Sequence, residues 1–295
     1  MERINKLYLY ESNENQWDTP ISKEKQQTLI TALESGQVIF LPHLSFLLQE
    51  DEKQLLSPDC LKVGSKNISY NPITQEVKGS FDRTINLLQL MMGRFALQSQ
   101  QLINNLFPHY RPNLQWGRTS YRPAEILGRQ TSYRKDDTRL HVDAFPSSPT
   151  QGTRILRVFS NINPFDQPRV WHLGEPFKQV AEKFLPTIKS PLFSSRKILQ
   201  LLGITKSYRT LYDHYMLNIH DTMKGDLDYQ RNVQKMRVDF PPHSTWIVMT
   251  DHVSHAALSG QYLMEQTFNL PVDGMADESQ SPLRTLEALL NKPLI

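Results

Sequence analysis

The sequence predicts a mostly β domain, a barrel or sandwich of antiparallel strands with helices packed around it. Three observations support this fold class. Short apolar-rich runs separated by turns fill residues 114–175 and 244–271, which is typical of antiparallel strands. Apolar residues at helical spacing mark the segment before these runs and the segment between them. The chain has 295 residues, 39% hydrophobic and 21% charged, which suits a globular protein with a sizeable core.

Residues 1–110 are expected to support the core with helices and a strand. Ser22 can cap a helix that Gly36 ends, because the apolar residues between them share one face. The strand QVIFLP, residues 37–42, should follow. A second helix is expected over residues 80–106, whose apolar residues recur at helical spacing, and it should back a sheet.

The predicted core consists of residues 111–175 and 236–272, with a helical insertion of residues 176–235 between its two halves. The expected strands are, in chain order, LQWGRTSY, TRLHVDAF, TRILRVFSNIN, PRVWHLG, STWIVMT, HAALSG and QYLMEQTFNLP. An amphipathic helix over residues 282–295 should close the chain. Because the sequence has no internal repeat or long linker, residues 1–295 are interpreted as a single domain.

Composition excludes several classes of protein. The net charge of +3 is too small for a protein that coats nucleic acid, so no nucleic-acid partner is expected. Cys60 is the single cysteine, which excludes an intramolecular disulfide and allows a reducing cytoplasm. The sequence has neither an apolar stretch near the roughly 20 residues that span a bilayer nor a signal-peptide pattern. The absence of a Gly-rich phosphate loop and a nucleophile elbow disfavours kinases and serine hydrolases.

A candidate metal site combines the triplet HVD with a histidine in the segment TDHVSHAALSGQ. His141 and Asp143 are two residues apart in an expected strand, so their side chains should point to the same face. Two histidines and one carboxylate form the facial triad of non-haem Fe(II) oxygenases, which leaves open positions on the iron. Zinc is the competing assignment, but catalytic zinc more often has three histidines, or two histidines with a glutamate.

Two histidines compete for the third ligand position. We favour His255, because an extended VSHAAL places small residues beside it that leave room for a metal. His252 is expected at a solvated turn. A rival cluster of His214, Asn218 and Asp221 is better explained as the solvated face of a helix.

Six phrases of the sequence resemble the Kdo 3-hydroxylases, which are bacterial Fe(II)/2-oxoglutarate-dependent oxygenases. They are RLHVDAFP, RILRVFSNINP, PRVWHLGEPF, GDLDYQRN, VDFPPHSTWIVMTD and SHAALSGQYLMEQTFNLP, within residues 114–290. The resemblance implies a double-stranded β-helix, or jelly-roll, cupin-like core that carries iron at its open end.

The same resemblance implies a function. The family uses Fe(II), 2-oxoglutarate and dioxygen to hydroxylate C3 of 3-deoxy-D-manno-oct-2-ulosonic acid (Kdo) while this sugar is attached to lipid A. The reaction belongs to lipopolysaccharide biosynthesis in Gram-negative bacteria. We therefore expect a cytoplasmic protein with peripheral contact to the inner membrane, and the sequence indicates no protein partner.

The binding site of 2-oxoglutarate must differ from that of many oxygenases of the wider superfamily. Those proteins hold the far carboxylate with an arginine in the strand after the distal histidine, where this sequence reads LMEQTF. The anchor is therefore expected in TRILRVFSNIN, on Arg157 with Asn161 on the same face, and Arg154 is the second choice. A buried arginine needs an anion, so the alternative is that Arg157 pairs with an internal acid.

A basic segment just before HVD is the expected substrate site. Arginine matches carboxylate and phosphate groups bidentately, so several arginines here suit an anionic glycolipid. The alternative is an ordinary solvated loop. The residues proposed to contact the substrate are Arg118, Tyr121, Arg122, Tyr133 and Arg134.

Two other functions remain open at this point. One is a cupin-like metalloenzyme that acts on a sugar acid without 2-oxoglutarate. The other is a non-catalytic jelly-roll that binds an anionic glycolipid. Release of succinate and carbon dioxide would exclude the first, and binding of Fe(II) would argue against the second.

Overall fold

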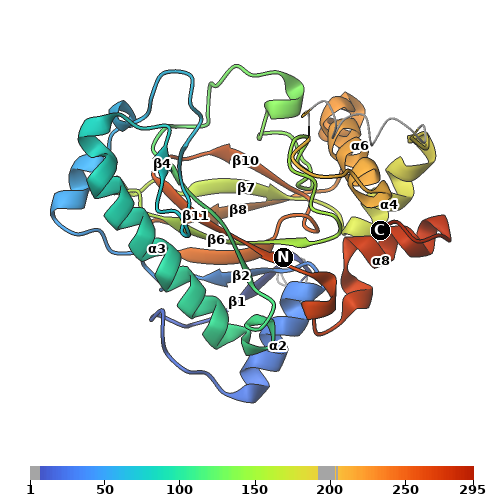
Figure 1. Cartoon of the computed structure of the whole chain (residues 1–295), viewed down its shortest axis with the longest axis horizontal. Coiled ribbons are helices and arrows are strands. Elements are labelled where there is room, and N and C mark those ends of the chain that lie inside the picture. Colours follow the sequence, from blue (N-terminus) through green and yellow to red (C-terminus); the bar gives the residue numbers. More distant parts are fainter. Residues whose placement is uncertain (1–6, 192–202, 204) are drawn as a thin grey trace.

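Two packed β-sheets form the centre of the computed structural model, which describes residues 7–191, 203 and 205–295 (Figure 1). The larger sheet has, in spatial order, strands β1 (Leu9–Glu11), β2 (Val38–Leu41), β9 (Thr245–Met249), β6 (Arg154–Asn161), β11 (Leu263–Leu270), β5 (Gln115–Arg122), β3 (Ile68–Tyr70) and β4 (Val77–Lys78). The smaller sheet has β10 (His255–Ser259), β7 (Arg169–Leu173) and β8 (Met236–Phe240). Neighbouring strands are antiparallel except β1 and β2, which confirms the predicted jelly-roll class.

Aromatic side chains fill the space between the two sheets. Phe159 and Trp246 come from the larger sheet, and Trp171 and Phe240 come from the smaller one. The rings of Phe240 and Trp246 stack at 4.0 Å, and Phe159 meets Trp171 edge to face at 5.2 Å. Such large buried rings stabilise the sandwich and fix the distance between its sheets.

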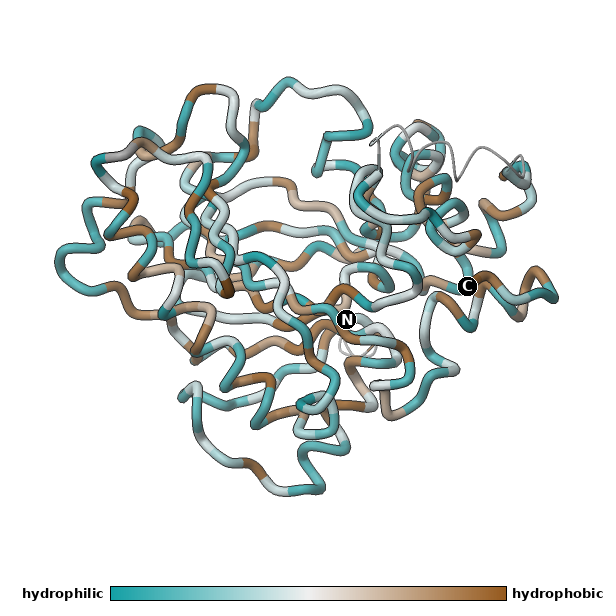
Figure 2. The backbone as a smooth tube through the Cα atoms, in the orientation of Figure 1, coloured by the Kyte–Doolittle hydropathy of each residue, from teal (hydrophilic) through white to brown (hydrophobic). Residues whose placement is uncertain are grey.

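The outer face of the larger sheet is covered by the helices α2 (Lys23–Glu34) and α3 (Ile85–Leu106), as Figure 1 shows. The Ser22 hydroxyl accepts a hydrogen bond from the backbone of Lys25, so the predicted N-cap of α2 is present. Gly36 follows with φ at +92°, a conformation that glycine adopts without strain. In Figure 2 the most hydrophobic stretches lie along the central strands and these helices, and the outer loops are mostly hydrophilic.

A second group of helices lies at one end of the sandwich. The segment between β7 and β8 contains α4 (Phe177–Phe184), α6 (Leu211–Gly225) and α7 (Leu227–Asn232), and α8 (Pro282–Leu290) packs with them around a shared apolar cluster. Residues 192–202 and 204 of the expected helical insertion lie outside the described residues. None of the described helices is both long and apolar enough to cross a membrane.

One expected strand is wrong. The run TRLHVDAF, residues 138–145, makes a single bridge in which His141 pairs with His255. The side-chain amide of Gln230 bonds to both the backbone N–H and the carbonyl of Leu140, at 2.8 and 2.9 Å, so these groups are not paired with a strand on that side of the segment. The strands β1, β3, β4 and β8 are additions to the sequence prediction.

Candidate metal centre and substrate cavity

Three ligand side chains converge at the end of the smaller sheet. The candidate ligand atoms of His141, Asp143 and His255 all lie within 4.8 Å of one another. His141 and His255 exchange two backbone hydrogen bonds of 3.0 and 2.9 Å, which places their rings side by side. The backbone N–H of Asp143 is bonded to the Thr250 carbonyl at 2.8 Å, so the carboxylate is fixed next to them.

The hydrogen bonds of the two histidines suit metal binding. Nδ1 of His141 lies 2.8 Å from the carbonyl oxygen of Arg139, and Nδ1 of His255 lies 2.8 Å from that of Val253. Because a carbonyl can only accept, each Nδ1 carries the proton and each Nε2 keeps its lone pair for a metal. Two such imidazoles and a carboxylate are the donor set that holds Fe(II).

The electrostatics of the site favour a neutral His255 and an ionised Asp143. Burial, together with the neighbouring His141, lowers the pKa of His255 to about 4, so this imidazole is neutral. Burial alone would raise the pKa of Asp143, but Arg157 and the two histidines outweigh it and hold the pKa well below its usual range. The site therefore offers an ionised carboxylate and a neutral imidazole without a change of protonation.

The rival ligands lie elsewhere. His252 is buried rather than solvated at a turn, which corrects that part of the prediction. It packs on Phe177 and beside Gly36, and burial, followed by Arg154, lowers its pKa to about 3. In the second rival cluster, Asp221 pairs with Arg134 at 2.9 Å.

A cavity of about 250 Å³ surrounds the three ligands. Trp171 forms part of its wall and stacks on the His255 ring, with ring centres 5.1 Å apart. The charged residues that line the cavity besides the metal ligands are Lys66, Arg122, Asp137, Arg157, Arg169 and Glu265. A partly open space with several guanidinium groups suits a small dianion next to the metal.

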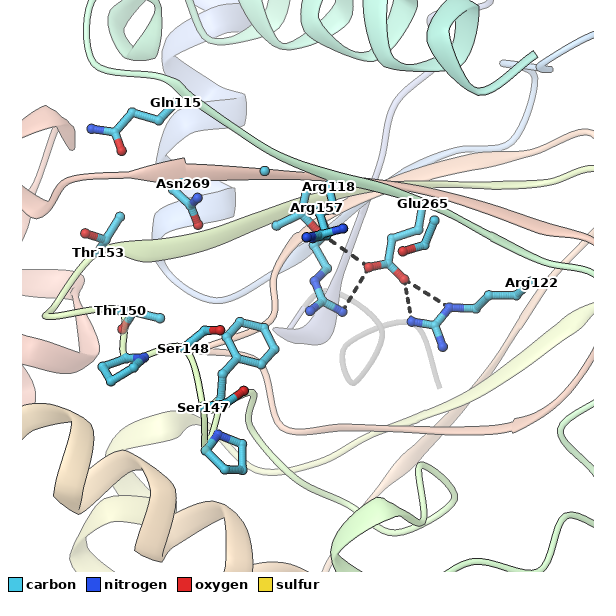
Figure 3. Close-up of a pocket in the computed structure, with 16 residues that line it drawn as sticks. Gln115, Arg118, Arg122, Ser147, Ser148, Thr150, Thr153, Arg157, Glu265 and Asn269 are labelled. Carbon is cyan, nitrogen blue, oxygen red and sulfur yellow. Dashed lines mark hydrogen bonds and ion pairs between the residues drawn. The ribbon is translucent and has the colours of Figure 1, made fainter. Parts of the chain in front are cut away.

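Glu265 brings two of these arginines together (Figure 3). Arg122 donates from Nε and Nη2 to one of its oxygens, at 3.1 and 2.7 Å. Arg157 Nη1 lies 3.3 Å from the other oxygen, and Arg157 Nη2 lies 3.1 Å from the Asp143 carboxylate. The alternative that Arg157 pairs with an internal acid is therefore the arrangement in the structure.

Arg169 is a site residue that the sequence analysis missed. Its side chain is nearly fully buried, with 3% exposed, and Nη1 donates to the Gly260 carbonyl at 2.7 Å. Nε has no hydrogen-bond partner in the part of the chain that the structure describes. Burial, followed by the nearby Arg122, lowers the pKa of Arg169 to about 9. Alternation along PRVWHLG, which puts Arg169 on the same face as Trp171, could have identified it.

Two residues that were predicted to act with or in place of Arg157 do not line this cavity. Arg154 is three positions away on β6 and so faces the opposite side, where its Nε lies 2.6 Å from Asp251 Oδ2. The Asn161 side chain is bonded to backbone groups of β8 and of the turn after β6. Both side chains therefore have structural partners.

A second cavity of about 580 Å³ adjoins the first one and shares Arg122, Phe145, Arg157 and Glu265 with it. Figure 3 shows Arg118, Arg122 and Arg157 on one side of this space and the loop with Ser147 and Ser148 on the other. The remaining residues that line it are Gln115, Gly117, Ser120, Pro146, Pro149, Thr150, Thr153, Thr267 and Asn269.

The structure places some of the predicted substrate residues at the larger cavity and the others away from it. Arg118 and Arg122 line the larger cavity. Tyr121 lies on the opposite face of β5, where its hydroxyl donates to the Leu55 carbonyl in the apolar core, so its interpretation as a substrate residue is corrected. Tyr133 and Arg134 line neither cavity and lie near α6, where Arg134 forms its ion pair with Asp221.

The two sheets and the triad beside an arginine-rich cavity define an iron-dependent oxygenase of the jelly-roll type. The family model described as 3-deoxy-D-manno-oct-2-ulosonic acid (Kdo) hydroxylase matches residues 16–293. The chain therefore belongs to the Kdo hydroxylase family, which consists of Fe(II)/2-oxoglutarate-dependent dioxygenases. The predicted family, fold class and cofactors are confirmed.

Solved structures of the Kdo hydroxylase KdoO, a non-heme Fe(II) α-ketoglutarate-dependent dioxygenase, are similar over nearly the full length. The complex with α-ketoglutarate and Fe(III) is 48% identical, covers 98% of this chain and 97% of that chain, and has a TM-score of 0.94. The apo structure has the same identity and coverage and a TM-score of 0.95. The complex with succinate and Fe(III) is 48% identical, covers 97% of each chain, and has a TM-score of 0.94. No curated protein matches the chain.

Proposed function

We propose that this Kdo hydroxylase acts on C3 of Kdo that is attached to a lipid A precursor, during lipopolysaccharide biosynthesis. The observation that carries this proposal is the junction of the two cavities. The smaller one encloses the triad, and the larger one begins at Arg122, Arg157 and Glu265. A cosubstrate beside the metal and a bulky anionic glycolipid in the larger space can therefore be bound together.

The protein holds the reactants through its own side chains. When bound to His141, Asp143 and His255, Fe(II) supplies open positions for a 2-oxo acid and dioxygen. Arg157 orients the Asp143 carboxylate through their 3.1 Å contact. Trp171 covers one face of His255 and excludes water from that side.

We propose Arg169 as the anchor of the far carboxylate of 2-oxoglutarate. Among the arginines of the smaller cavity, Arg122 pairs with Glu265 and Arg157 pairs with both Glu265 and Asp143, whereas the guanidinium of Arg169 forms no ion pair with any described residue. A buried guanidinium without a counter-ion is unfavourable, and a bound carboxylate would remove that penalty. This choice replaces the sequence-based preference for Arg157.

The larger cavity is proposed to bind the glycolipid. Arg118 and Arg122 line it from β5, and guanidinium groups bind phosphates such as those of a lipid A precursor. The lipid would be reached by peripheral contact with the cytoplasmic face of the inner membrane. Such contact depends on exposed charges, so it should weaken as salt rises.

The proposal is tested by measuring oxygen incorporation into Kdo-lipid A and into free Kdo, with Arg118→Ala and Arg122→Ala alongside. We expect turnover of the lipid-linked sugar to exceed that of free Kdo, and both substitutions to raise the KM for the glycolipid. Equal turnover of both sugars, with no response to either substitution, would contradict the lipid-linked, basic-pocket proposal.

A further inference from the structure

Lys66 lines the smaller cavity around the triad, here called the metal cavity. The proposed reaction assigns no role to this lysine. It lies in the loop between Leu61, which bridges to Ser80, and strand β3, so it comes from outside the two segments that carry the triad. Its side chain is 38% exposed, in contrast to the buried Arg169 of the same cavity. Lys66 therefore lies where the metal cavity meets solvent.

The present partners of Lys66 are a backbone carbonyl and a carboxylate that it shares with another lysine. Its amine donates to the Lys135 carbonyl at 2.6 Å and lies 3.8 Å from Asp137 Oδ2. The other oxygen of Asp137 lies 3.7 Å from the amine of Lys224, whose side chain is 2% exposed. If Lys66 moves away, Asp137 keeps a cation beside it, so the movement does not leave an unpaired buried charge.

The three arginines of the cavity already have partners or a proposed role. Arg122 and Arg157 are held by Glu265, and Arg157 also contacts Asp143. Arg169 is buried and bonded to the Gly260 carbonyl, where it suits the cosubstrate. Lys66 is thus the cation of this cavity best placed to meet a second anion that enters from solvent.

The chemistry of the substrate requires such a second anion site. The Kdo carboxyl carbon is bonded to C2, which is bonded to C3, so the carboxylate is two bonds from the proposed site of hydroxylation. When C3 faces the metal, the carboxylate must lie within the same cavity. We propose that Lys66 binds the carboxylate of Kdo and thereby selects a sugar acid, an inference that rests on the function proposed above. A lysine suits this task because its amine is a compact charge on a flexible stem.

Lys66→Gln tests this inference, because glutamine lacks the charge but can still donate to the Lys135 carbonyl. Lys62→Gln is the matched control, since Lys62 is an exposed lysine of the same loop that lines neither cavity. For Lys66→Gln we expect the KM for Kdo-lipid A to rise at least about tenfold, as for loss of a charge-assisted hydrogen bond. The KM for 2-oxoglutarate should stay within about twofold, and Lys66→Arg should restore most of the affinity.

A substrate analogue separates recognition from a structural effect. Kdo-lipid A in which the Kdo carboxylate is converted to the carboxamide should be a poor substrate of the wild-type protein, and Lys66→Gln should not weaken it further. Equal losses on the acid and the amide, or an unchanged KM for the acid, would overturn the assignment of Lys66. Failure of the wild-type protein to add oxygen to Kdo at all would instead overturn the proposed function and this inference with it.

Discussion

The metal centre depends on how each histidine uses its second nitrogen. In both His141 and His255, Nδ1 is bonded to the carbonyl oxygen two residues earlier in the chain, at 2.8 Å. The backbone therefore selects the tautomer of both rings before any metal arrives. The same local arrangement explains why the two rings present Nε2 to Asp143.

At the residue scale, the first prediction separates the two histidines of the segment TDHVSHAALSGQ. His255→Ala should abolish iron binding and turnover, because the triad loses one of its imidazoles. His252→Ala should keep the iron content and lower stability, because it leaves a cavity beside Phe177. Metal analysis and turnover of both purified variants provide the measurement. Full activity in His255→Ala, with loss of iron in His252→Ala, would reverse the assignment.

The second residue-scale prediction concerns the cosubstrate. Arg169→Ala should raise the KM for 2-oxoglutarate at least about tenfold, since a charge-assisted pair contributes roughly 1.5 to 3 kcal/mol. Arg157→Ala should act mainly on iron affinity, because Arg157 contacts the Asp143 carboxylate. Steady-state kinetics at varied 2-oxoglutarate distinguish these effects. If Arg157→Ala alone raises this KM, the anchor is Arg157, as the sequence suggested.

At the scale of elements, a helix replaces a strand beside the metal. The short helix α7 supplies Gln230, whose amide satisfies both backbone groups of Leu140, and Leu140 directly precedes His141. The same amide also donates to the Met223 carbonyl in α6 at 2.8 Å. The helical segment between β7 and β8 therefore positions a metal ligand that belongs to no strand.

This arrangement leads to the third prediction. Gln230→Ala leaves the N–H and C=O of Leu140 without their partner, so we expect a loss of roughly 1 to 3 kcal/mol in the free energy of unfolding. Iron affinity should fall as well, because His141 is less well held. Urea unfolding and metal titration provide the measurements, with the exposed neighbour Arg231→Ala as the control. Unchanged iron affinity in Gln230→Ala would show that α7 does not position the ligand.

Elements with a sustained apolar periodicity were predicted correctly from the sequence. The prediction failed where a side chain takes the place of a neighbouring strand in bonding to the backbone. Clear apolar patterns mark the elements that were predicted, which include the helices α2 and α3 and the strands β5, β6, β7, β9, β10 and β11. The strand expected at residues 138–145 does not form, and Gln230 bonds to the backbone there instead. This contact was not predictable from the local pattern, because Gln230 is distant in sequence. Strand β8 could have been predicted, because its apolar and polar residues alternate in the sequence as they alternate in burial. Strand β4 has only two residues, which is too short to show a pattern.

The site was predictable to a similar extent. The triplet HVD and the resemblance identified the metal ligands, because their types and spacing are specific. Alternation along β5 would have separated Tyr121 from Arg118 and Arg122. The partners of Arg157 and the unpaired state of Arg169 could not be foreseen, because they depend on which strands are adjacent in the folded sheets.

At the scale of the whole molecule, the triad joins segments that are distant in the chain. One ligand begins β10 of the smaller sheet, and the other two come from the segment 138–145 that runs beside it. Binding of metal and cosubstrate should therefore stabilise the complete fold rather than one element, since these ligands bind the folded state.

The fourth prediction follows from this linkage. Fe(II) under anaerobic conditions should raise the thermal midpoint, and 2-oxoglutarate should add to the increase only when metal is present. A ligand at about 100 times its Kd contributes about 2.7 kcal/mol at one site. Differential scanning fluorimetry of the wild-type protein and of His255→Ala measures the effect. A 2-oxoglutarate-dependent increase without metal would contradict binding at the triad.

The most direct test of the central claim is an isotope measurement with purified, iron-loaded protein, 2-oxoglutarate, Kdo-lipid A and oxygen-18 gas. Mass spectrometry of the products follows the label. A Kdo hydroxylase of this class should place one labelled oxygen on C3 of Kdo and the other in succinate, in equal amounts, and His255→Ala should do neither. Succinate formed without labelled Kdo, or labelled Kdo formed without 2-oxoglutarate, would contradict the account.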